Sequence, residues 1–376
     1  MNIKLDANQL KINDSLFQLQ MTVDHIPHIS LFLLCLANSS VINIDDSPYK
    51  DSLEAYLLNL KNKNLNLDKI SRTFATILAG AVGDAFGYTI EFMQEDSIKQ
   101  KFGILQEFQD TASDDTQMTL FTILGIKNMD IHEAYKDWYR TQQQQKNFFT
   151  GKSQAIQVRR APGNTCLQSL SSRVHIKNSS KGCGTIMRVA PFGLFSETRD
   201  QAFQSAYKAS EITHGHIDGL LPAGIFAAMI FDAVHKIPIT YSNYDQFVPQ
   251  QYLDQYDKSQ TKRILQKLQT INPEQPKISI ESYFKSNFLQ QLHQLGEGWV
   301  AEETLAISLL SIQAANSFKN LCILSSNHKG DSDSTASVAG NLYGALNGLK
   351  SIDIQSLVKL DLFEEIIFTI WYYYLN

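Results

Sequence analysis

Two clusters of acidic and hydroxyl residues are the part of this sequence best suited to chemistry. They are residues 113–116 (Ser-Asp-Asp-Thr) and residues 331–334 (Asp-Ser-Asp-Ser), and each directly precedes a stretch with apolar residues at helical spacing. Carboxylate and hydroxyl oxygens are the ligands that Mg²⁺ and Mn²⁺ prefer, and adjacent carboxylates repel each other unless a cation offsets their charge. The pattern therefore predicts either one divided metal site or, more simply, two sets of helix N-caps.

The elements that must position these clusters are predicted to be helices. From Ile70 onward the sequence has mostly helical periodicity, with one apolar stripe that includes Phe74, Ile77 and Val82. Small residues within the same stretch, such as Gly80 and Gly83, would permit close contact with another helix. Strand signals are few, so the pattern predicts an all-α fold.

The first part of the chain, residues 1–67, differs in composition and is predicted to be an extension of a main body formed by residues 68–376. Within the extension, Ile29–Ala37 is interpreted as a buried helix or strand, and Asp51–Leu60 as an amphipathic helix. In the main body, the polar stretch Tyr241–Gln260 is expected to form an excursion before the helical pattern resumes.

Composition excludes several classes of protein. The chain has 376 residues, 43% of them hydrophobic, and a formal charge of -5, which is typical of a globular protein and gives no electrostatic reason to expect nucleic acid. Its four cysteines are dispersed, without the spacing of a zinc site or a disulfide scaffold. The N-terminus does not resemble a signal peptide, and the apolar run at residues 29–37 is too short to span a bilayer. A cytoplasmic protein without membrane contact is expected.

Five further motifs accompany the acid clusters. They are Gly83-Asp84-Ala85-Phe86-Gly87 with Glu91-Phe92, Arg160–Cys166, Gly182–Pro191, Thr213-His214, and Gly296–Glu303. Taken in this order with the two clusters, they strongly resemble the ADP-ribosylglycohydrolase family. The resemblance extends from about Ile70 to the C-terminus.

The resemblance implies a compact all-helical domain with a binuclear Mg²⁺ or Mn²⁺ centre that cleaves the bond between ADP-ribose and a modified side chain. The metal ligands that it implies are Ser113, Asp114, Asp115, Asp331, Asp333 and Ser334. Ser334 stands where many members have threonine, which presents a hydroxyl at the same point. The two cations would bind the vicinal ribose hydroxyls and activate a water molecule for attack at the anomeric carbon.

Glu91 and Asp115 are the two candidates for the catalytic proton acceptor, and the sequence does not decide between them. Asp84 is interpreted as an alternative case, a buried acid with a structural role.

By family position, the expected substrate contacts include the glycine-containing loop that lies against the diphosphate and the histidine that lines the ribose pocket. These residues are Gly182, Cys183, Gly184, Thr185, Met187 and His214. Cys183 replaces the asparagine or small polar residue that is common in the family.

Two functions follow from the resemblance. The first is hydrolytic removal of ADP-ribose from a modified protein, with arginine as the expected linkage and immunity against an ADP-ribosyltransferase toxin as a biological role consistent with it. The second is stoichiometric inhibition, in which residues 1–67 would block such a transferase directly. A simpler interpretation of the extension is that it packs against the catalytic body.

Overall fold

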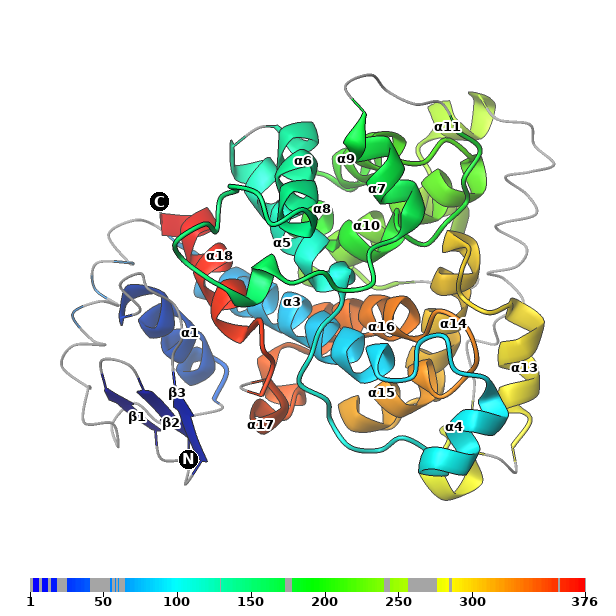
Figure 1. Ribbon diagram of the computed structural model, residues 1–376, viewed down its shortest axis with the longest axis horizontal. Helices are drawn as coiled ribbons and strands as arrows, with labels where there is room; N and C mark the ends of the chain where they lie inside the picture. The colour runs from blue at the N-terminus through cyan, green and yellow to red at the C-terminus, as the bar shows by residue number, and fades with distance from the viewer. Residues whose placement is uncertain are drawn as a thin grey trace.

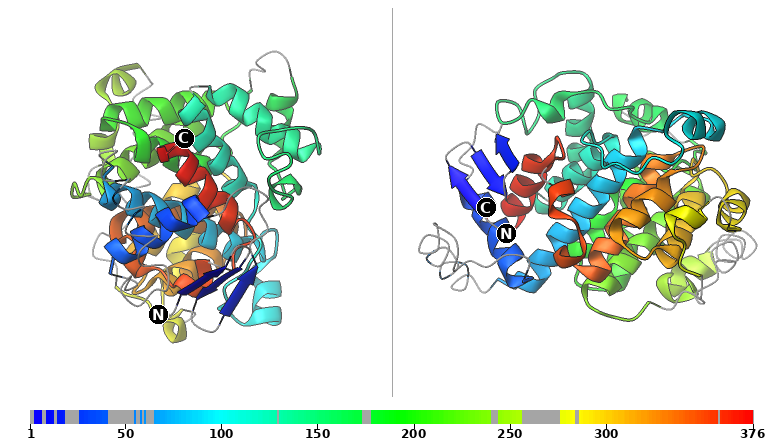
Figure 2. Two further views of the ribbon diagram at one scale, coloured as in Figure 1. Left: turned by 90° about the vertical axis from the view of Figure 1, so that its left-hand side faces the viewer. Right: turned by 90° about the horizontal axis from the view of Figure 1, so that it is seen from below.

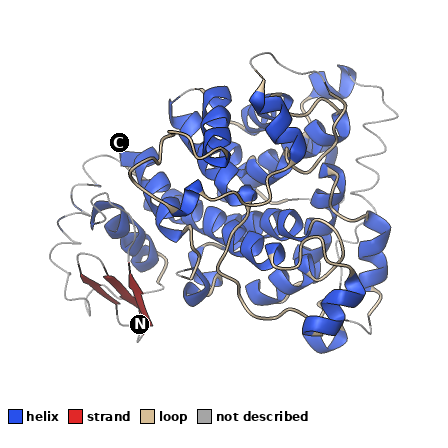
Figure 3. Cartoon of the chain, viewed as in Figure 1, coloured by secondary structure: helices blue, strands red, loops and turns tan. Residues whose placement is uncertain are grey.

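A computed structural model describes most of the chain, namely residues 3–6, 9–12, 15–18, 26–40, 55, 58, 60, 65–128, 130–172, 178–239, 244–255, 276–283, 286–357 and 359–375. From residue 65 onward the described part is helical and contains no strand, as Figure 3 shows. The predicted all-α fold of the main body is therefore confirmed.

Two long helices, α3 (Leu67–Tyr88) and α16 (Ser332–Asn347), form the centre of the fold (Figure 1). They pack with their backbones in direct contact because glycines line the interface. A Cβ atom on Gly83 would lie 2.1 Å from the carbonyl oxygen of Ala336, and one on Gly340 would lie 2.2 Å from that of Ala79. The small residues noted at 79–83 thus serve the close contact that the sequence predicts.

Further helices surround this pair. Helices α14 (Ala301–Ala314) and α15 (Phe318–Ser326) pack against α16, and α5 (Asp114–Asn128) packs against α6 (Ile131–Gln142). The other helices are α4 (Glu95–Phe102), α7 (Asn164–Ser171), α8 (Ala190–Phe195), α9 (Arg199–Glu211), α10 (Ile217–Val234), α11 (Gln250–Gln255), α13 (Phe288–Leu295), α17 (Ile354–Leu357) and α18 (Phe363–Leu375). Short 3-10 turns connect them at η2 (Ala155–Gln157), η3 (Ile186–Arg188), η4 (Tyr244–Phe247), η5 (Ile280–Ser282) and η6 (Leu349–Ser351).

Helix α10 is long and apolar enough to cross a membrane, but every one of its residues is buried inside the structure. It contacts α8, α9, α14 and α16. Burial on all sides is typical of a central helix in a large core. We therefore interpret α10 as a core element.

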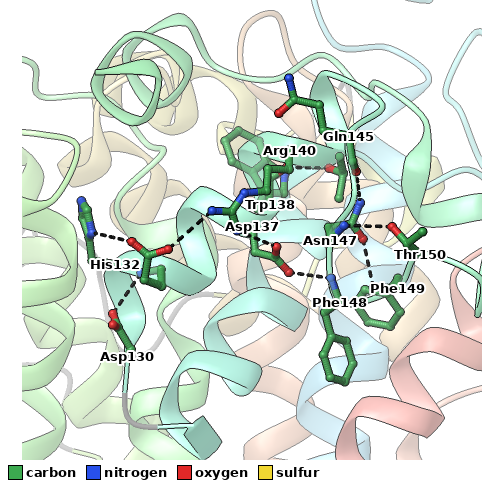
Figure 4. A network of polar contacts seen from close by, with 12 residues as sticks. Asp130, His132, Asp137, Trp138, Arg140, Gln145, Asn147, Phe148, Phe149 and Thr150 are labelled. Carbon is green, nitrogen blue, oxygen red and sulfur yellow. Dashed lines mark hydrogen bonds and ion pairs between the residues drawn. The ribbon is translucent and has the colours of Figure 1, made fainter. Parts of the chain in front are cut away.

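The connection after α6 is held by its own polar contacts, drawn in Figure 4. Asp137 forms an ion pair with Arg140 at 2.9 Å and accepts a hydrogen bond from the backbone N–H of Phe148 at 2.7 Å. Asn147 accepts from the backbone N–H of Phe149 at 2.9 Å. This ordered segment leads to Arg160, which fixes the residues in front of α5.

The N-terminal region contains a feature that the sequence did not predict, a three-stranded antiparallel sheet. Its strands β1 (Ile3–Asp6), β2 (Gln9–Ile12) and β3 (Ser15–Gln18) follow the order β1-β2-β3, with Ile3 opposite Ile12 and Gln9 opposite Gln18. The sheet lies at one end of the molecule beside α1 (Ile26–Asn38) (Figures 1 and 2). The strands escaped prediction because each has only four residues, although β1 and β2 alternate strictly between apolar and polar positions, as in Ile3-Lys4-Leu5-Asp6.

Helix α1 belongs to the core, which confirms the interpretation of Ile29–Ala37 as a buried element. Phe32 is buried and packs edge-on against Phe74 of α3 and Phe363 of α18, with ring centroids 5.2 and 5.6 Å apart. The helix predicted at 51–60 lies outside the described residues except at positions 55, 58 and 60, which are helical. The residues directly after Gln260, where the helical pattern is expected to resume, also lie outside the described part.

Candidate metal centre

The close contact between α3 and α16 brings the end of one helix to the start of the other. A Cβ atom on Gly87 would lie 2.1 Å from the carbonyl oxygen of Ser332, and the Ser332 hydroxyl donates to the Gly87 carbonyl at 2.8 Å. Glu91 follows α3 by three residues, and Asp331 is the N-cap of α16. Helix packing therefore determines where these carboxylates meet.

Three carboxylates converge at this junction. Glu91, Asp331 and Asp333 each present an oxygen, and these atoms lie within 4.8 Å of one another. Asp331 and Asp333 are buried, whereas Glu91 is partly exposed. The spacing and the all-oxygen donor set suit a hard divalent cation.

Asp84 organises the first acid cluster from the neighbouring helix. Its carboxylate accepts from the backbone N–H groups of Ser113 at 2.9 Å and Thr116 at 3.0 Å, and from the Thr116 hydroxyl at 2.5 Å. Asp84 is thus a buried structural acid that caps the first turn of α5. The Ser113 hydroxyl accepts from the Asp115 N–H at 3.1 Å.

Capping explains only some of the acids. Asp331 and Asp333 accept from the Ser334 N–H at 3.3 and 2.9 Å, as N-terminal acids often do. By contrast, buried oxygens of Glu91, Asp114 and Asp115 have no hydrogen-bond partner among the described residues. An unpaired buried carboxylate oxygen is costly, and a cation is the partner that this donor set fits.

The electrostatics of the cluster support the same conclusion. Burial and the repulsion of Asp333 and other acids raise the pKa of Glu91 to about 11 and that of Asp84 to about 7. Burial, followed by the charge of Asp333, also raises the pKa values of Asp114 and Asp115. These carboxylates cannot all ionise together unless positive charge is added.

Cys183 contributes a thiol to the edge of the centre. Its Sγ lies 2.6 Å from Asp331 Oδ2, and its backbone N–H donates to the Trp299 carbonyl at 3.1 Å. Burial and the nearby Asp331 raise the pKa of Cys183, so the thiol stays protonated and donates. The structure thus places Cys183 beside a metal-ligand candidate.

His214 lies under the glycine-containing loop. A Cβ atom on Gly182 or Gly184 would lie 3.1 or 3.0 Å from its ring. Burial, followed by the charge of Arg188, lowers the pKa of His214 to about 3, so the ring is neutral. The loop and the histidine are therefore brought together, as their family positions imply.

A buried hydrogen-bond relay orients the His214 ring. Arg188 donates to Thr213 Oγ1 at 2.7 Å, and this oxygen lies 2.8 Å from His214 Nδ1 but 3.5 Å from the Ser210 carbonyl. The shorter contact assigns the Thr213 proton to Nδ1. The N–H of the neutral ring is then on Nε2, the atom nearest Gly182.

Two of the expected substrate contacts face other protein groups. The Thr185 hydroxyl donates to the Gly219 carbonyl at 2.7 Å, which anchors the loop. Met187 is buried in η3, and its carbonyl accepts from the Thr119 hydroxyl at 3.3 Å. Among the described residues, neither Thr185 nor Met187 forms a hydrogen bond with the carboxylates of the centre.

Sequence reasoning missed how several residues hold the loops of the centre. Arg160 donates to the Ala112 carbonyl at 2.6 Å and pairs with Asp361 at 2.6 Å, which fixes the approach to Ser113. Glu303 accepts from the backbone N–H of Gly298 at 3.2 Å, one turn before α14. Both residues hold loops in place, but their loop contacts leave no signal in the sequence.

Comparison with known proteins shows which family the chain is similar to. The sequence model of the ADP-ribosylglycohydrolase family matches residues 65–369. ADP-ribosylarginine hydrolase Tri1 of Pseudomonas putida (strain GB-1) is 24% identical over 305 residues, which cover 77% of this chain and 74% of the relative. A solved structure described as an ADP-ribosylglycohydrolase-related protein complex has a TM-score of 0.56 and 21% identity, and the match covers 82% of this chain and 98% of that one. The likeness to the solved structure concerns the fold alone.

Proposed function

Because the chain belongs to the ADP-ribosylglycohydrolase family, we propose that it is a metal-dependent hydrolase that removes ADP-ribose from arginine side chains of a modified protein. One observation carries the proposal, namely the buried oxygens of Glu91, Asp114 and Asp115, which lack hydrogen-bond partners within the described part of the chain where three helices meet. The arginine linkage is supported by the name of the relative from Pseudomonas putida.

The ligand set that we propose for two Mg²⁺ or Mn²⁺ ions consists of carboxylates and hydroxyls from the starts of α5 and α16. These residues are Ser113, Asp114, Asp115, Asp331, Asp333 and Ser334. Bound there, the cations would supply Lewis acidity to hydroxyl oxygens of the substrate and to water. Their charge would also lower the raised pKa values of the cluster, because it favours the ionised carboxylates.

Glu91 is the better of the two candidates for the proton acceptor. It is partly exposed and follows the end of α3, so its carboxylate can face both the buried acids and the substrate. Asp115 is buried within the first turn of α5, a position that suits a ligand. In this proposal Glu91 takes the proton of the attacking water, and the fixed acids stabilise positive charge that develops on the ribose.

The loop at Gly182–Thr185 and His214 are proposed to hold the rest of the ADP-ribose. Backbone N–H groups of a glycine-containing loop suit the diphosphate oxygens. The Nε2–H of His214 is available for a substrate oxygen because Thr213 occupies Nδ1. The neutral ring would keep this role across the physiological pH range.

Release of ADP-ribose from an arginine-ADP-ribosylated protein tests the proposal. The purified chain is assayed with Mg²⁺, with Mn²⁺ and with chelator, beside the double variant Asp114→Ala/Asp115→Ala and the exposed control Asp200→Asn. We expect ADP-ribose release that requires a cation, persists in the control and is lost in the double variant. Release that survives chelator would contradict the metal site, and no release by a folded chain would contradict the arginine linkage.

A second function, direct inhibition of an ADP-ribosyltransferase as an immunity factor, is supported by the N-terminal sheet. The sheet precedes the family match, which begins at residue 65, and its order leaves β1 and β3 as edge strands. Edge strands can pair with another chain. We place such an encounter in the cytoplasm, where an imported toxin would act.

Inhibition is measured separately from hydrolysis. The Asp114→Ala/Asp115→Ala variant is titrated into an arginine-specific ADP-ribosyltransferase, and transfer is followed with and without residues 1–18. Stoichiometric inhibition that requires these residues is expected. Equal transfer at every concentration would contradict the inhibitor role.

A further inference from the structure

Two exposed aromatic rings stack beside the candidate metal centre. Phe92 is 65% exposed and Trp299 is 37% exposed, and their ring centroids lie 5.5 Å apart with planes inclined by 23°. Large apolar side chains with this exposure are rare among the described residues, where the others are Leu58, Val158 and Ile237. We call Phe92 and Trp299 the aromatic pair.

The backbone of Phe92 adopts a conformation that bulky residues seldom occupy. Its φ is +65°, in the left-handed region. The turn is held in place by hydrogen bonds from the Glu91 N–H to the Gly87 carbonyl and from the Met93 N–H to the Ile90 carbonyl, both 3.0 Å long. Such strain, kept by its surroundings, is typical of functional sites. Its effect here is that Glu91 contributes to the acid cluster while its neighbour Phe92 lies at the surface.

Trp299 is fixed from several directions. Its carbonyl accepts from the Cys183 N–H at 3.1 Å, and its side chain forms a hydrogen bond with the Glu297 carboxylate, which also pairs with Lys329 at 2.8 Å. The preceding Gly298 has a φ of +88° and packs against Asp331, so that a Cβ atom there would lie 3.1 Å from the Asp331 carbonyl oxygen. The ring is therefore positioned before any ligand binds, which reduces the entropic cost of binding.

Acidic residues accompany the aromatic pair. A hollow of about 490 Å³ lies among the loops that carry the pair, and Glu95, Asp96 and Glu297 line it together with His293 and Lys329. Glu91, the residue before Phe92, converges with Asp331 and Asp333 of the metal centre. Within the hollow Glu297 pairs with Lys329 at 2.8 Å and Glu95 with His293 at 3.0 Å, so it is the neighbouring carboxylates of Glu91, Asp331 and Asp333 that favour a positively charged group over an anion.

We propose that the aromatic pair binds the guanidinium of the arginine from which ADP-ribose is removed. This inference rests on the proposed function, since it names the part of the site that holds the leaving group. The anomeric carbon is bonded directly to a hydroxyl-bearing carbon of the ribose. The group that leaves it therefore emerges beside the cations, where Glu91 and Phe92 are consecutive residues.

The chemistry of the pair fits a guanidinium better than an ammonium. A guanidinium is planar and weakly hydrated, and it stacks face to face on an aromatic ring as well as being attracted by its negative face. The exposed ring of Phe92 offers such a face, and Trp299 supports it from behind. The adenine of ADP-ribose is the other planar group that could stack there, and the two ligands predict different kinetics.

The test compares Phe92→Leu, Trp299→Leu and the conservative Phe92→Tyr with the wild type and with Ile237→Ala, another exposed apolar residue. For each, we would measure the KM for arginine-ADP-ribosylated protein and the inhibition constant of ADP-ribose, which lacks the arginine. For the two leucine variants, we expect KM to rise roughly 3- to 30-fold with an unchanged inhibition constant. Phe92→Tyr and Ile237→Ala should resemble the wild type.

Other outcomes would overturn the inference. A parallel rise of KM and the inhibition constant would assign the aromatic pair to adenine, and unchanged KM values in folded leucine variants would leave it without a role in binding. Folding is checked by circular dichroism and by retention of Mg²⁺ binding.

A binding measurement separates this inference from the proposed function. Agmatine, which carries a guanidinium, and 1,4-diaminobutane, which carries only ammonium groups, are titrated calorimetrically into each variant with Mg²⁺ and ADP-ribose present. Agmatine binding that is lost in Phe92→Leu supports the inference even if the wild type releases no ADP-ribose. Equal affinities for agmatine and 1,4-diaminobutane would contradict the inference. So would an affinity for agmatine that is the same in Phe92→Leu and in the wild type.

Discussion

At the scale of single residues, the acids of the candidate centre divide into structural and chemical groups. Asp84 is satisfied by three hydrogen bonds and caps α5, whereas Asp114 and Asp115 retain buried oxygens without partners among the described residues. Asp333 contributes to the raised pKa of Glu91, Asp84, Asp114 and Asp115. It is thus the acid whose charge most affects the others.

Asp333→Asn should therefore change stability in opposite directions with and without metal. Without metal the free energy of unfolding should rise by about 1–2 kcal/mol, because each pKa unit of relieved repulsion corresponds to roughly 1.4 kcal/mol. The stabilisation that Mg²⁺ gives to the wild type should be lost. Thermal unfolding in chelator and in Mg²⁺ measures both effects, with Asp200→Asn as the control. A variant that keeps the full Mg²⁺ shift would exclude Asp333 as a ligand.

Glu365, a buried acid of α18, provides a test of pH dependence. Burial raises its pKa from 4.5 to about 7, and it accepts a hydrogen bond from Ser153. Between these two pH values the folded chain keeps a proton that the unfolded chain has lost, so the free energy of unfolding falls as pH rises.

Glu365→Gln should remove this part of the pH dependence. At about pH 8 it should be more stable than the wild type by up to about 3 kcal/mol, and at about pH 4 the difference should vanish. Urea unfolding at several pH values measures the effect, with Glu364→Gln as the control in the same turn. A constant difference between variant and wild type at all pH values would contradict the assignment.

At the scale of elements, the site depends on the distance between α3 and α16. Glycines at their interface leave no room for a Cβ atom, since one on Gly83 would lie 2.1 Å from a backbone oxygen. The ends of the helices carry Glu91, Asp331 and Asp333, whose oxygens lie within 4.8 Å. A small increase in helix separation would therefore move the ligands apart.

Gly83→Ala should push α3 and α16 apart, and it should therefore lower both the stability of the fold and the affinity of the metal site. The overpacked contact is expected to cost about 3 kcal/mol of unfolding free energy, and the affinity for Mg²⁺ should fall. Gly163→Ala is the matched control, because a Cβ atom there meets nothing within 4 Å. Urea unfolding and Mg²⁺ titration measure the two effects. Equal stability of the two variants would contradict the role of the interface.

At the scale of the whole molecule, the described part of the N-terminal region contains a three-stranded sheet and helix α1. Helix α1 is built into the core through Phe32, which contacts α3 and α18, and the Ser71 hydroxyl donates to the Cys35 carbonyl at 3.3 Å. These contacts lie near the start of α3, roughly 20 Å along the helix from its end. The extension therefore joins the molecule away from the metal centre.

Truncation should distinguish the two parts. Removal of residues 1–18 should leave a folded chain that still hydrolyses substrate, because α1 remains. Removal of residues 1–38 should prevent folding, since burial of Leu31, Phe32 and Leu36 stabilises by about 1.5–3 kcal/mol each, a large share of a typical total of about 5–15 kcal/mol. Circular dichroism and ADP-ribose release measure the outcomes. A folded, active chain without residues 1–38 would contradict the role of α1.

The sequence by itself determined the helical class of the main body, the acid clusters at the starts of helices and the family. These features are local, because helical periodicity and motif order can be read from neighbouring residues. The tertiary structure alone decided which acids cap helices and which remain unpaired, because Asp84 reaches α5 from another helix. It also decided the joint position of Glu91 and Asp333 and the exposure of Phe92 beside Trp299. These depend on contacts between residues far apart in the chain, which no local pattern records.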